Sequence, residues 1–215
     1  MRTMRKIIVV VLLLFVATVA QAADRATVVL VGGYGNTEDR MEYLRENIPG
    51  SVTVIAKRSY PLSSGAADVM RQITEKGITT KVVLVGYSWG GNIVRKLAVE
   101  YPDMVTAVVT IGSPSGGVWG CPWFVYEPGD DKIETPLYVV AGYKKGSESW
   151  FSNGLTDGVV DLSSALEIKR KVAGMIVLEG VDHTELTESE TVVDTINRWI
   201  APYNALQVTA MASLD

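Results

Sequence analysis

The order of apolar runs and turns in this 215-residue chain predicts an α/β fold, with a mostly parallel central sheet and helices on both faces. Two observations predict it. Short runs rich in valine, isoleucine and leucine stop at glycine or polar residues, as buried parallel strands do. Between them lie segments whose apolar residues recur every three or four positions, which is typical of amphipathic helices. The composition, with 47% hydrophobic and 20% charged residues, is that of one globular domain.

Six apolar runs are predicted strands. Thr27–Val31 (TVVLV) stops at Gly32 and Lys81–Val85 (KVVLV) stops at Gly86, and both are apolar enough to be buried on two faces. The full set is Thr27–Val31, Val52–Ala56, Lys81–Val85, Val105–Ile111, Leu137–Ala141 and Met175–Leu178.

Helices are expected between these strands. The first should begin at Asn36 or Thr37 and end before Gly50, where glycine terminates it. The others are Ser64–Glu75, a helix from after Ser88 to about Tyr101, Ser163–Val172, and a final helix that contains Val192, Val193, Ile196, Trp199 and Ile200. Residues 201–215 are weakly patterned and are expected to form a loose tail. In such sheets the ligand site lies outside the carboxyl ends of the strands.

The amino terminus has the pattern of a secretory signal peptide. Arg2, Arg5 and Lys6 precede an apolar run, Ile7–Val19, which ends at Ala20-Gln21-Ala22. The run is shorter than the roughly 20 residues that span a bilayer. We therefore expect a signal peptide at residues 1–22, one domain at residues 23–215, and export to the periplasm or the medium.

The charge of the mature chain argues against nucleic acid as a partner. Removal of Arg2, Arg5 and Lys6 leaves 17 of the 20 basic residues and all 24 acidic residues, which gives a net charge of −7. One histidine and the single Cys121 cannot form a zinc site of the usual kind, and Asp130-Asp131 is expected to be a solvated turn and not a calcium site. The sequence therefore predicts no metal and no cofactor.

Gly86-Tyr87-Ser88-Trp89-Gly90 is a G-x-S-x-G pentapeptide that directly follows one predicted strand and directly precedes one predicted helix. This context is that of a nucleophile elbow, in which a sharp turn exposes the serine hydroxyl. Side chains at Gly86 and Gly90 would collide with the neighbouring strand and helix, and the helix amino terminus favours developing negative charge. Ser88 is the candidate nucleophile.

His183, the only histidine, is the candidate general base, because a serine hydroxyl needs a base to remove its proton. It lies in a loop between the last predicted strand and the last predicted helix. The third member must be a carboxylate that fixes the imidazole tautomer. The alternatives are Asp157, Asp161, Glu179 and Asp182. Asp157, in a turn with Gly158, is favoured and Asp161 is second, whereas Asp182 is adjacent to His183 and should point away from it.

The oxyanion of an acyl-transfer reaction needs two preorganised donors. One expected donor is the backbone N–H of Trp89, which follows the nucleophile. The other is the N–H of Tyr34 in the turn Gly32-Gly33-Tyr34-Gly35. A phosphate-binding loop is a weaker interpretation of this turn, because no Gly-Lys-Ser/Thr follows it.

With these motifs the chain resembles the small bacterial lipases and esterases of the α/β-hydrolase superfamily, from about Thr27 to Ile200. The resemblance rests on the strand and turn Val29–Gly35, the elbow Gly86–Gly91, the loop Gly112–Gly117, and the acid loop Asp157–Val160 with Ser163–Ala165. It implies an α/β-hydrolase fold with little or no cap domain and supports the order Ser88, Asp157, His183.

The sequence also departs from this family. Gly32 stands where the oxyanion turn usually has histidine, Tyr87 stands at the elbow histidine, Ser115 stands at a loop histidine, and Asp161 stands where proline is frequent. None of these positions belongs to the family's triad. The short chain leaves room only for a loop as a lid, and Gly117–Pro128, with Trp119, Trp123 and Phe124, is either that lid or an aromatic segment buried against the sheet.

The resemblance implies hydrolysis of a carboxylic ester with an apolar acyl group through an acyl-Ser88 intermediate. A thioesterase or acyltransferase with the same triad, and a non-catalytic binding protein that retains the fold, are the alternatives. The expected partner is a small-molecule or lipid ester, with transient contact to a membrane or lipid surface. The sequence does not predict the oligomeric state.

Overall fold

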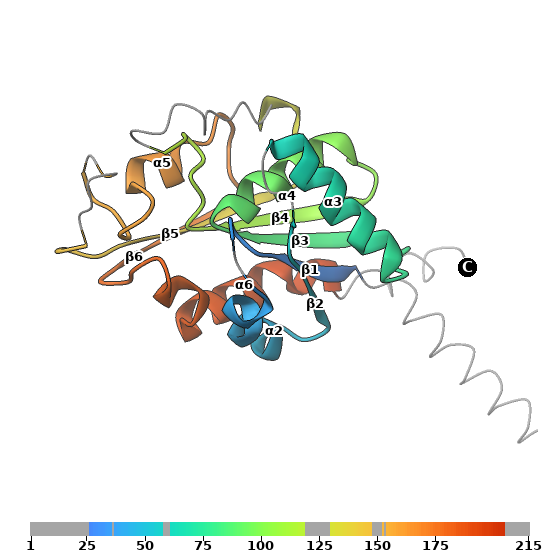
Figure 1. Cartoon of the computed structure of the whole chain (residues 1–215), viewed down its shortest axis with the longest axis horizontal. Helices are drawn as coiled ribbons and strands as arrows, with labels where there is room; N and C mark the ends of the chain where they lie inside the picture. Colours follow the sequence, from blue (N-terminus) through green and yellow to red (C-terminus); the bar gives the residue numbers. More distant parts are fainter. Residues whose placement is uncertain are drawn as a thin grey trace, which may run out of the picture.

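The computed structural model describes residues 26–35, 37–57, 61–118, 130–147, 152 and 154–204. Its centre is a six-stranded sheet in the order β2-β1-β3-β4-β5-β6, and every neighbouring pair is parallel (Figure 1). The strands are β1 (Thr27–Val31), β2 (Ser51–Val54), β3 (Val82–Tyr87), β4 (Val105–Ile111), β5 (Leu137–Tyr143) and β6 (Gly174–Glu179). The predicted α/β fold with a parallel sheet is confirmed.

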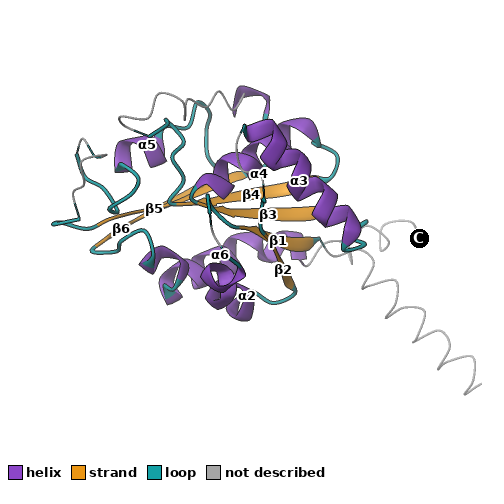
Figure 2. Ribbon diagram, viewed as in Figure 1, coloured by secondary structure: helices purple, strands orange, loops and turns teal. Residues whose placement is uncertain are grey.

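Helices cover both faces of this sheet (Figures 1 and 2). One layer holds α3 (Leu62–Glu75), α4 (Trp89–Glu100) and α5 (Leu162–Leu166), and the other holds α2 (Glu42–Asn47) and α6 (Glu190–Asn204). Three short 3-10 helices complete the described elements: η1 (Glu38–Met41), η3 (Asp130–Lys132) and η4 (Glu185–Thr187). Within the described ranges no helix combines the length and apolar character needed to cross a bilayer.

The strands divide the core into two halves because successive side chains point to opposite faces. In β1, Val28 and Leu30 pack in the cluster that includes η1, α2 and α6, whereas Val29 and Val31 pack against α3 and α4. All four are buried. Burial of each such side chain stabilises the fold by about 1.5–3 kcal/mol relative to an exposed position. This two-sided burial explains why the strand sequences are apolar without alternation.

The predicted helices differ from the structure in three places. The helix expected from Asn36 or Thr37 begins as the 3-10 helix η1 and is α-helical only in α2. The expected helix Ser163–Val172 ends already at Leu166, because Glu167 has ψ 78° and leaves the helical region. The following chain places Ile168 and Val172 against the α3 and α4 half of the core before β6 begins. The expected loose tail is also partly helical, since α6 extends to Asn204.

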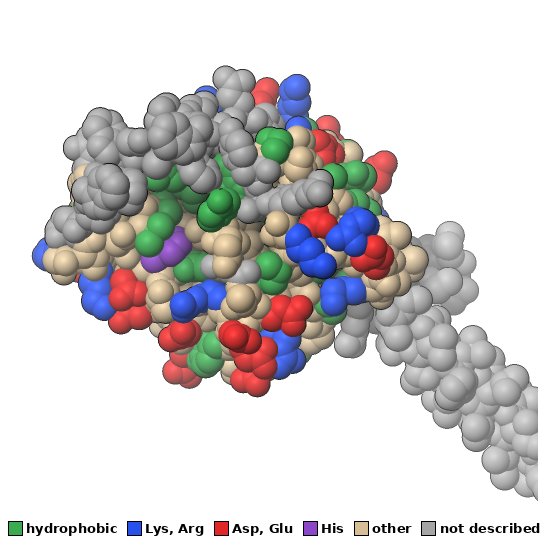
Figure 3. All heavy atoms as spheres, in the orientation of Figure 1, with side chains coloured by type: hydrophobic (Ala, Val, Ile, Leu, Met, Phe, Trp, Pro, Cys, Tyr) green, Lys and Arg blue, Asp and Glu red, His purple; other side chains and the backbone are tan. Residues whose placement is uncertain are grey.

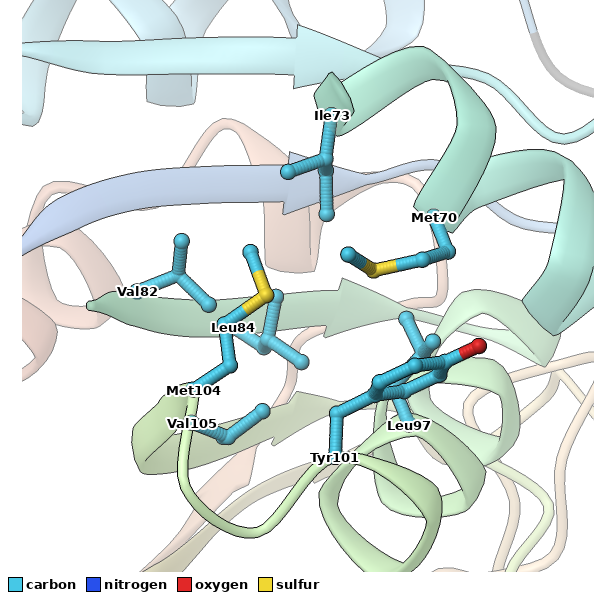
Figure 4. Close-up of a pocket in the computed structure, with 8 residues that line it drawn as sticks. All are labelled: Met70, Ile73, Val82, Leu84, Leu97, Tyr101, Met104 and Val105. Atoms are coloured by element: carbon cyan, nitrogen blue, oxygen red, sulfur yellow. The ribbon is translucent and has the colours of Figure 1, made fainter. Parts of the chain in front are cut away.

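An apolar crevice lies between β3, β4, α3 and α4 (Figure 4). Val82 and Val105, the first residues of β3 and β4, are part of its lining. The crevice is therefore at the amino ends of the strands, opposite the edge where ligands bind in such sheets. The remaining lining residues are Met70, Ile73, Leu84, Leu97, Tyr101 and Met104.

Asp130 is buried, and the predicted solvated turn at Asp130-Asp131 is therefore wrong for this residue. Its carboxylate accepts two hydrogen bonds from the guanidinium of Arg95 in α4, from Nε at 2.9 Å and from Nη2, and both side chains have no exposed surface. Asp131 is exposed. A buried guanidinium requires a partner, and sequence position alone did not indicate that Asp130 supplies it.

We expect Asp130→Ala to lower the free energy of unfolding by about 3–5 kcal/mol, because it removes the carboxylate from a fully buried guanidinium. The matched control is Glu100→Ala, which removes the partner of Lys96 in a half-exposed pair on the same helix (3.1 Å). That change should cost less than about 0.5 kcal/mol. Urea unfolding of the two variants measures the difference, and equal losses would contradict a special role for the buried pair.

Candidate active site

The turn Gly86–Gly90, here called the Ser88 turn, joins β3 to α4. Ser88 has φ 53° and ψ −127° and is the one non-glycine residue with positive φ in the described ranges. Such a conformation costs on the order of 1–3 kcal/mol and persists only where the surroundings enforce it. Here the backbone N–H of Ser88 donates to the carbonyl of Ile111 at the end of β4, at 2.8 Å.

Close main-chain contacts explain the glycines of the Ser88 turn. A Cβ on Gly86 would lie 2.4 Å from the carbonyl oxygen of Gly90, and a Cβ on Gly90 would lie 2.3 Å from the carbonyl oxygen of Val31. Both distances are well below van der Waals contact, so no side chain fits at either position. β1, β3 and α4 are thereby brought together at one point.

The turn after β1 lies directly against Ser88. A Cβ on Gly33 would be 2.7 Å from the Cβ of Ser88 and 3.2 Å from its Oγ. Tyr34, the expected oxyanion donor, follows Gly33, and its side chain is 62% exposed. Trp89, the other expected donor, is the first residue of α4 and is buried.

Asp157 and His183 are in direct contact. Asp157 Oδ2 and His183 Nδ1 lie 2.7 Å apart, and both residues are almost fully buried. The other carboxylate oxygen, Oδ1, accepts hydrogen bonds from the backbone N–H groups of Val159 and Val160, at 3.0 and 2.7 Å. Because a carboxylate only accepts, Nδ1 carries the proton in this contact and Nε2 is the basic nitrogen of the imidazole.

Gly112, directly after β4, leaves room for this contact. It has φ 51°, and a Cβ there would lie 2.9 Å from Leu186 Cδ1, 3.2 Å from Asp157 Oδ2 and 3.3 Å from His183 Nδ1. The end of β4 therefore packs against the Asp157–His183 pair as well as holding the Ser88 turn.

Asp182 and Glu185, on either side of His183 in the chain, form a capping box. The Asp182 carboxylate accepts from the backbone N–H of Glu185 (3.0 Å), and the Glu185 carboxylate accepts from the N–H of Asp182 (2.8 Å). Lys144, directly after β5, donates to Asp182 at 3.1 Å and to Glu185 at 2.8 Å. The Glu185 N–H foremost lowers the pKa of Asp182, and the bonds to Glu185 and Asp182 raise the pKa of Lys144.

The structure thus brings one of the four candidate carboxylates to the imidazole, namely Asp157. Asp161 stands at the amino end of α5, Glu179 forms an ion pair with Lys145 at 3.4 Å, and Asp182 is directed to Lys144. The expectation that Asp182 would not serve His183 agrees with these contacts.

Sequence reasoning assigned no contact to three residues of the site: Tyr87, Gly112 and Lys144. Tyr87 stands where the family's elbow has histidine, and its hydroxyl donates to the carbonyl of His183 at 3.0 Å. The D-x-x-E spacing of Asp182 and Glu185 is a signal for the capping box that could have been found. The Lys144 contact spans 38 residues and had no local signal.

The surface around the imidazole is mixed in character. The chain's one histidine side chain reaches the surface next to apolar and uncharged groups, and acidic and basic side chains intermingle on the neighbouring surface (Figure 3). The proposed lid residues Trp119, Trp123 and Phe124 lie outside the described residues, as does Cys121. In the described ranges no cluster of three or more His, Cys, Asp or Glu side chains could hold a metal ion.

A model of the family described as alpha/beta hydrolase fold matches residues 24–150, more than half of the chain. The chain therefore belongs to the α/β-hydrolase fold family. The match covers the Ser88 turn and ends before Asp157 and His183. A comparison with curated proteins gave no match.

Solved α/β-hydrolase structures share this fold at low sequence identity. An alpha/beta hydrolase fold protein from Chitinophaga pinensis superposes with a TM-score of 0.63 at 15% identity, over 83% of this chain and 91% of that one. A thermophilic esterase from Thermogutta terrifontis gives 0.61 at 12% identity, over 83% and 90%. A lipase-esterase related protein from Clostridium acetobutylicum gives 0.57 at 14% identity, over 83% and 94%.

We expect Asp182→Ala to lower the free energy of unfolding at pH 7 by about 1 kcal/mol, since it removes the cap beside His183. The pKa of Asp182 is lower in the folded protein than in the unfolded chain. Its stabilisation is therefore complete above the unfolded pKa of about 3.9 and is lost as the pH falls through the folded value.

Urea unfolding at pH 7, 5 and 3 tests this pH dependence. The difference between wild type and Asp182→Ala should be similar at pH 7 and 5 and smaller at pH 3. Asp194→Ala, at an exposed position of α6, controls for the loss of one surface carboxylate. A difference for Asp182→Ala that stays constant down to pH 3 would contradict the assigned role.

Proposed function

We propose that this protein is an exported serine hydrolase that cleaves carboxylic esters through an acyl-Ser88 intermediate. The observation that carries the proposal is the Asp157–His183 contact at the same sheet edge as the strained Ser88 turn. Membership of the α/β-hydrolase fold family supports hydrolase chemistry. The esterase and the lipase-esterase related protein among the similar structures support an ester substrate.

In the proposed reaction His183 Nε2 takes the proton of the Ser88 hydroxyl as Oγ attacks the ester carbonyl carbon. Asp157 holds Nδ1–H and stabilises the imidazolium that forms. The tetrahedral intermediate collapses as His183 gives its proton to the leaving alkoxide oxygen. Water, deprotonated by the same nitrogen, then attacks the acyl-serine carbonyl; the bond to Ser88 Oγ breaks, His183 returns the proton to Oγ, and the carboxylic acid is released.

The negative charge that develops on the carbonyl oxygen needs donors that are already in place. The N–H groups of Tyr34 and Trp89 are the proposed donors, because the Gly33 turn lies against Ser88 and Trp89 directly follows it. Each such donor is worth about 3 kcal/mol in the transition state. The amino end of α4, a helix of 12 residues, adds favourable partial positive charge at the same place.

The proposed substrate is a small-molecule or lipid ester with an apolar acyl group. Three of the exposed large apolar side chains, Tyr34, Leu155 and Val159, lie on the loops that carry or adjoin the site residues. Apolar side chains at the mouth of a site favour an apolar ligand and permit transient contact with a lipid surface. Export through the residue 1–22 signal peptide remains part of the proposal.

The test is the release of p-nitrophenol from short- and medium-chain p-nitrophenyl esters by the mature protein. A burst in the first turnover is expected, because an acyl-enzyme forms before water hydrolyses it. Ser88→Ala should abolish the burst and lower the turnover at least about a thousandfold, and Asp157→Asn should also lower the turnover by about a thousandfold or more.

Ser63→Ala, at an exposed serine of α3, is the matched control and should behave as wild type. A burst that survives in Ser88→Ala would exclude Ser88 as nucleophile. Absence of release from the wild type itself would favour a binding protein that retains the hydrolase fold.

A further inference from the structure

We infer that Tyr87 is a positioning residue that fixes His183 relative to Ser88, an inference that rests on the proposed function. Tyr87 is the last residue of β3 and immediately precedes Ser88 in the chain. It makes two contacts with His183, although 96 residues separate the two in sequence. Through Tyr87, the strand that carries the nucleophile also holds the loop that carries the base.

The first contact is a hydrogen bond to the main chain. The Tyr87 hydroxyl donates to the carbonyl oxygen of His183 at 3.0 Å, in a buried environment. Burial raises the pKa of the Tyr87 hydroxyl, so it stays protonated and remains a donor across the neutral and mildly alkaline range. Because donor and acceptor are both neutral, this contact does not depend on the protonation of the imidazole.

The second contact is between the two rings. The Tyr87 ring and the imidazole have centroids 4.9 Å apart and planes tilted by 35°. Contact between the two rings limits rotation of the imidazole about its side-chain bonds. Tyr87 itself is 3% exposed and packs in the half of the core that includes α6.

Tyr87 completes the set of contacts that hold His183. The His183 N–H donates to the carbonyl of Asp157 at 2.8 Å, Nδ1 contacts Asp157 Oδ2, and the His183 carbonyl accepts from Tyr87. Asp157 therefore holds the backbone N–H of His183 and fixes the tautomer of its imidazole. Both of these contacts tie His183 to the acid loop and not to β3. Among these partners, Tyr87 alone lies on the strand of the nucleophile, so it helps to set the separation of base and nucleophile together with the end of β4.

Tyr87→Phe tests this role, because it keeps the ring and removes the donor. The matched control is Tyr138→Phe in β5, which removes a hydroxyl bonded to the Tyr203 hydroxyl at 3.0 Å near the amino end of its strand. Unfolding curves, kcat and KM for a p-nitrophenyl ester, and the imidazole NMR resonances are measured for both variants. Since His183 is the only histidine, its resonances in untagged protein need no assignment. Active-site titration normalises kcat to the folded, reactive fraction.

We expect kcat of Tyr87→Phe to fall about ten- to a hundredfold, with KM changed less than about twofold, because a small displacement of a catalytic group has effects of this size. The Nδ1–H resonance should shift or broaden. Tyr138→Phe should keep wild-type kcat and imidazole resonances while it loses a similar amount of stability.

Two results would overturn the inference. One is a Tyr87→Phe variant with unchanged imidazole resonances, whatever its kcat or stability. The other is a loss of kcat that is equal in Tyr138→Phe. Failure of the proposed function is recognised separately, since the wild type would then show no burst, while the imidazole resonances of Tyr87→Phe would still report whether Tyr87 positions His183.

Discussion

The main-chain contact at the Ser88 turn is the constraint on which the site depends. Gly86 and Gly90 let β3, α4 and the end of β1 approach within distances that no side chain would allow, and Gly33 brings the following turn against Ser88. The positive φ of Ser88 is a consequence of this approach. Its cost, on the order of 1–3 kcal/mol, is offset by the burial of the strands and helix that meet there.

The parallel sheet brings the other residues of the site to the edge where the Ser88 turn lies. All six strands run in one direction, so the segments after β1, β3, β4, β5 and β6 meet at one edge. The turn at Gly33 follows β1, Ser88 follows β3, Gly112 follows β4, and the acid loop and the His183 loop follow β5 and β6. Residues that are more than a hundred positions apart therefore share one site without any long extension from the sheet.

The strands and the Ser88 turn could be predicted from the sequence because each depends on a short stretch of residues. The apolar runs located the six strands to within a few residues, and the glycine spacing of Gly86–Gly90 located the turn, because both follow from burial and steric fit along a short segment. The failures are long-range. The burial of Asp130 accompanies its ion pair with Arg95, 35 residues away, and after α5 ends at Leu166 the chain places Ile168 against a core half formed by distant segments.

The same distinction explains why Asp157 could be favoured but not fixed by the sequence. Asp157 and Asp161 are both at turns of the same loop, and the choice depends on which carboxylate meets a histidine 26 residues from Asp157. The structure places Asp157 there because Val159 and Val160 hold its other oxygen. A turn that binds one oxygen of its own aspartate in this way directs the second oxygen to His183, which a turn signal alone does not reveal.

The two halves of the site are held by different forces. β3, before Ser88, is buried along its whole length, so apolar packing and steric fit hold the Ser88 turn. β6, before His183, is an edge strand whose alternate residues are exposed, among them Met175 and Val177. The loop after β6 has two apolar anchors, the fully buried Leu186 in η4 and the partly buried Val181. Its polar contacts are made by the capping box, Lys144, Asp157 and the Tyr87 hydroxyl. Polar contacts of defined geometry compensate for the weaker burial at the sheet edge, and they fix the direction of the imidazole, which apolar packing alone does not.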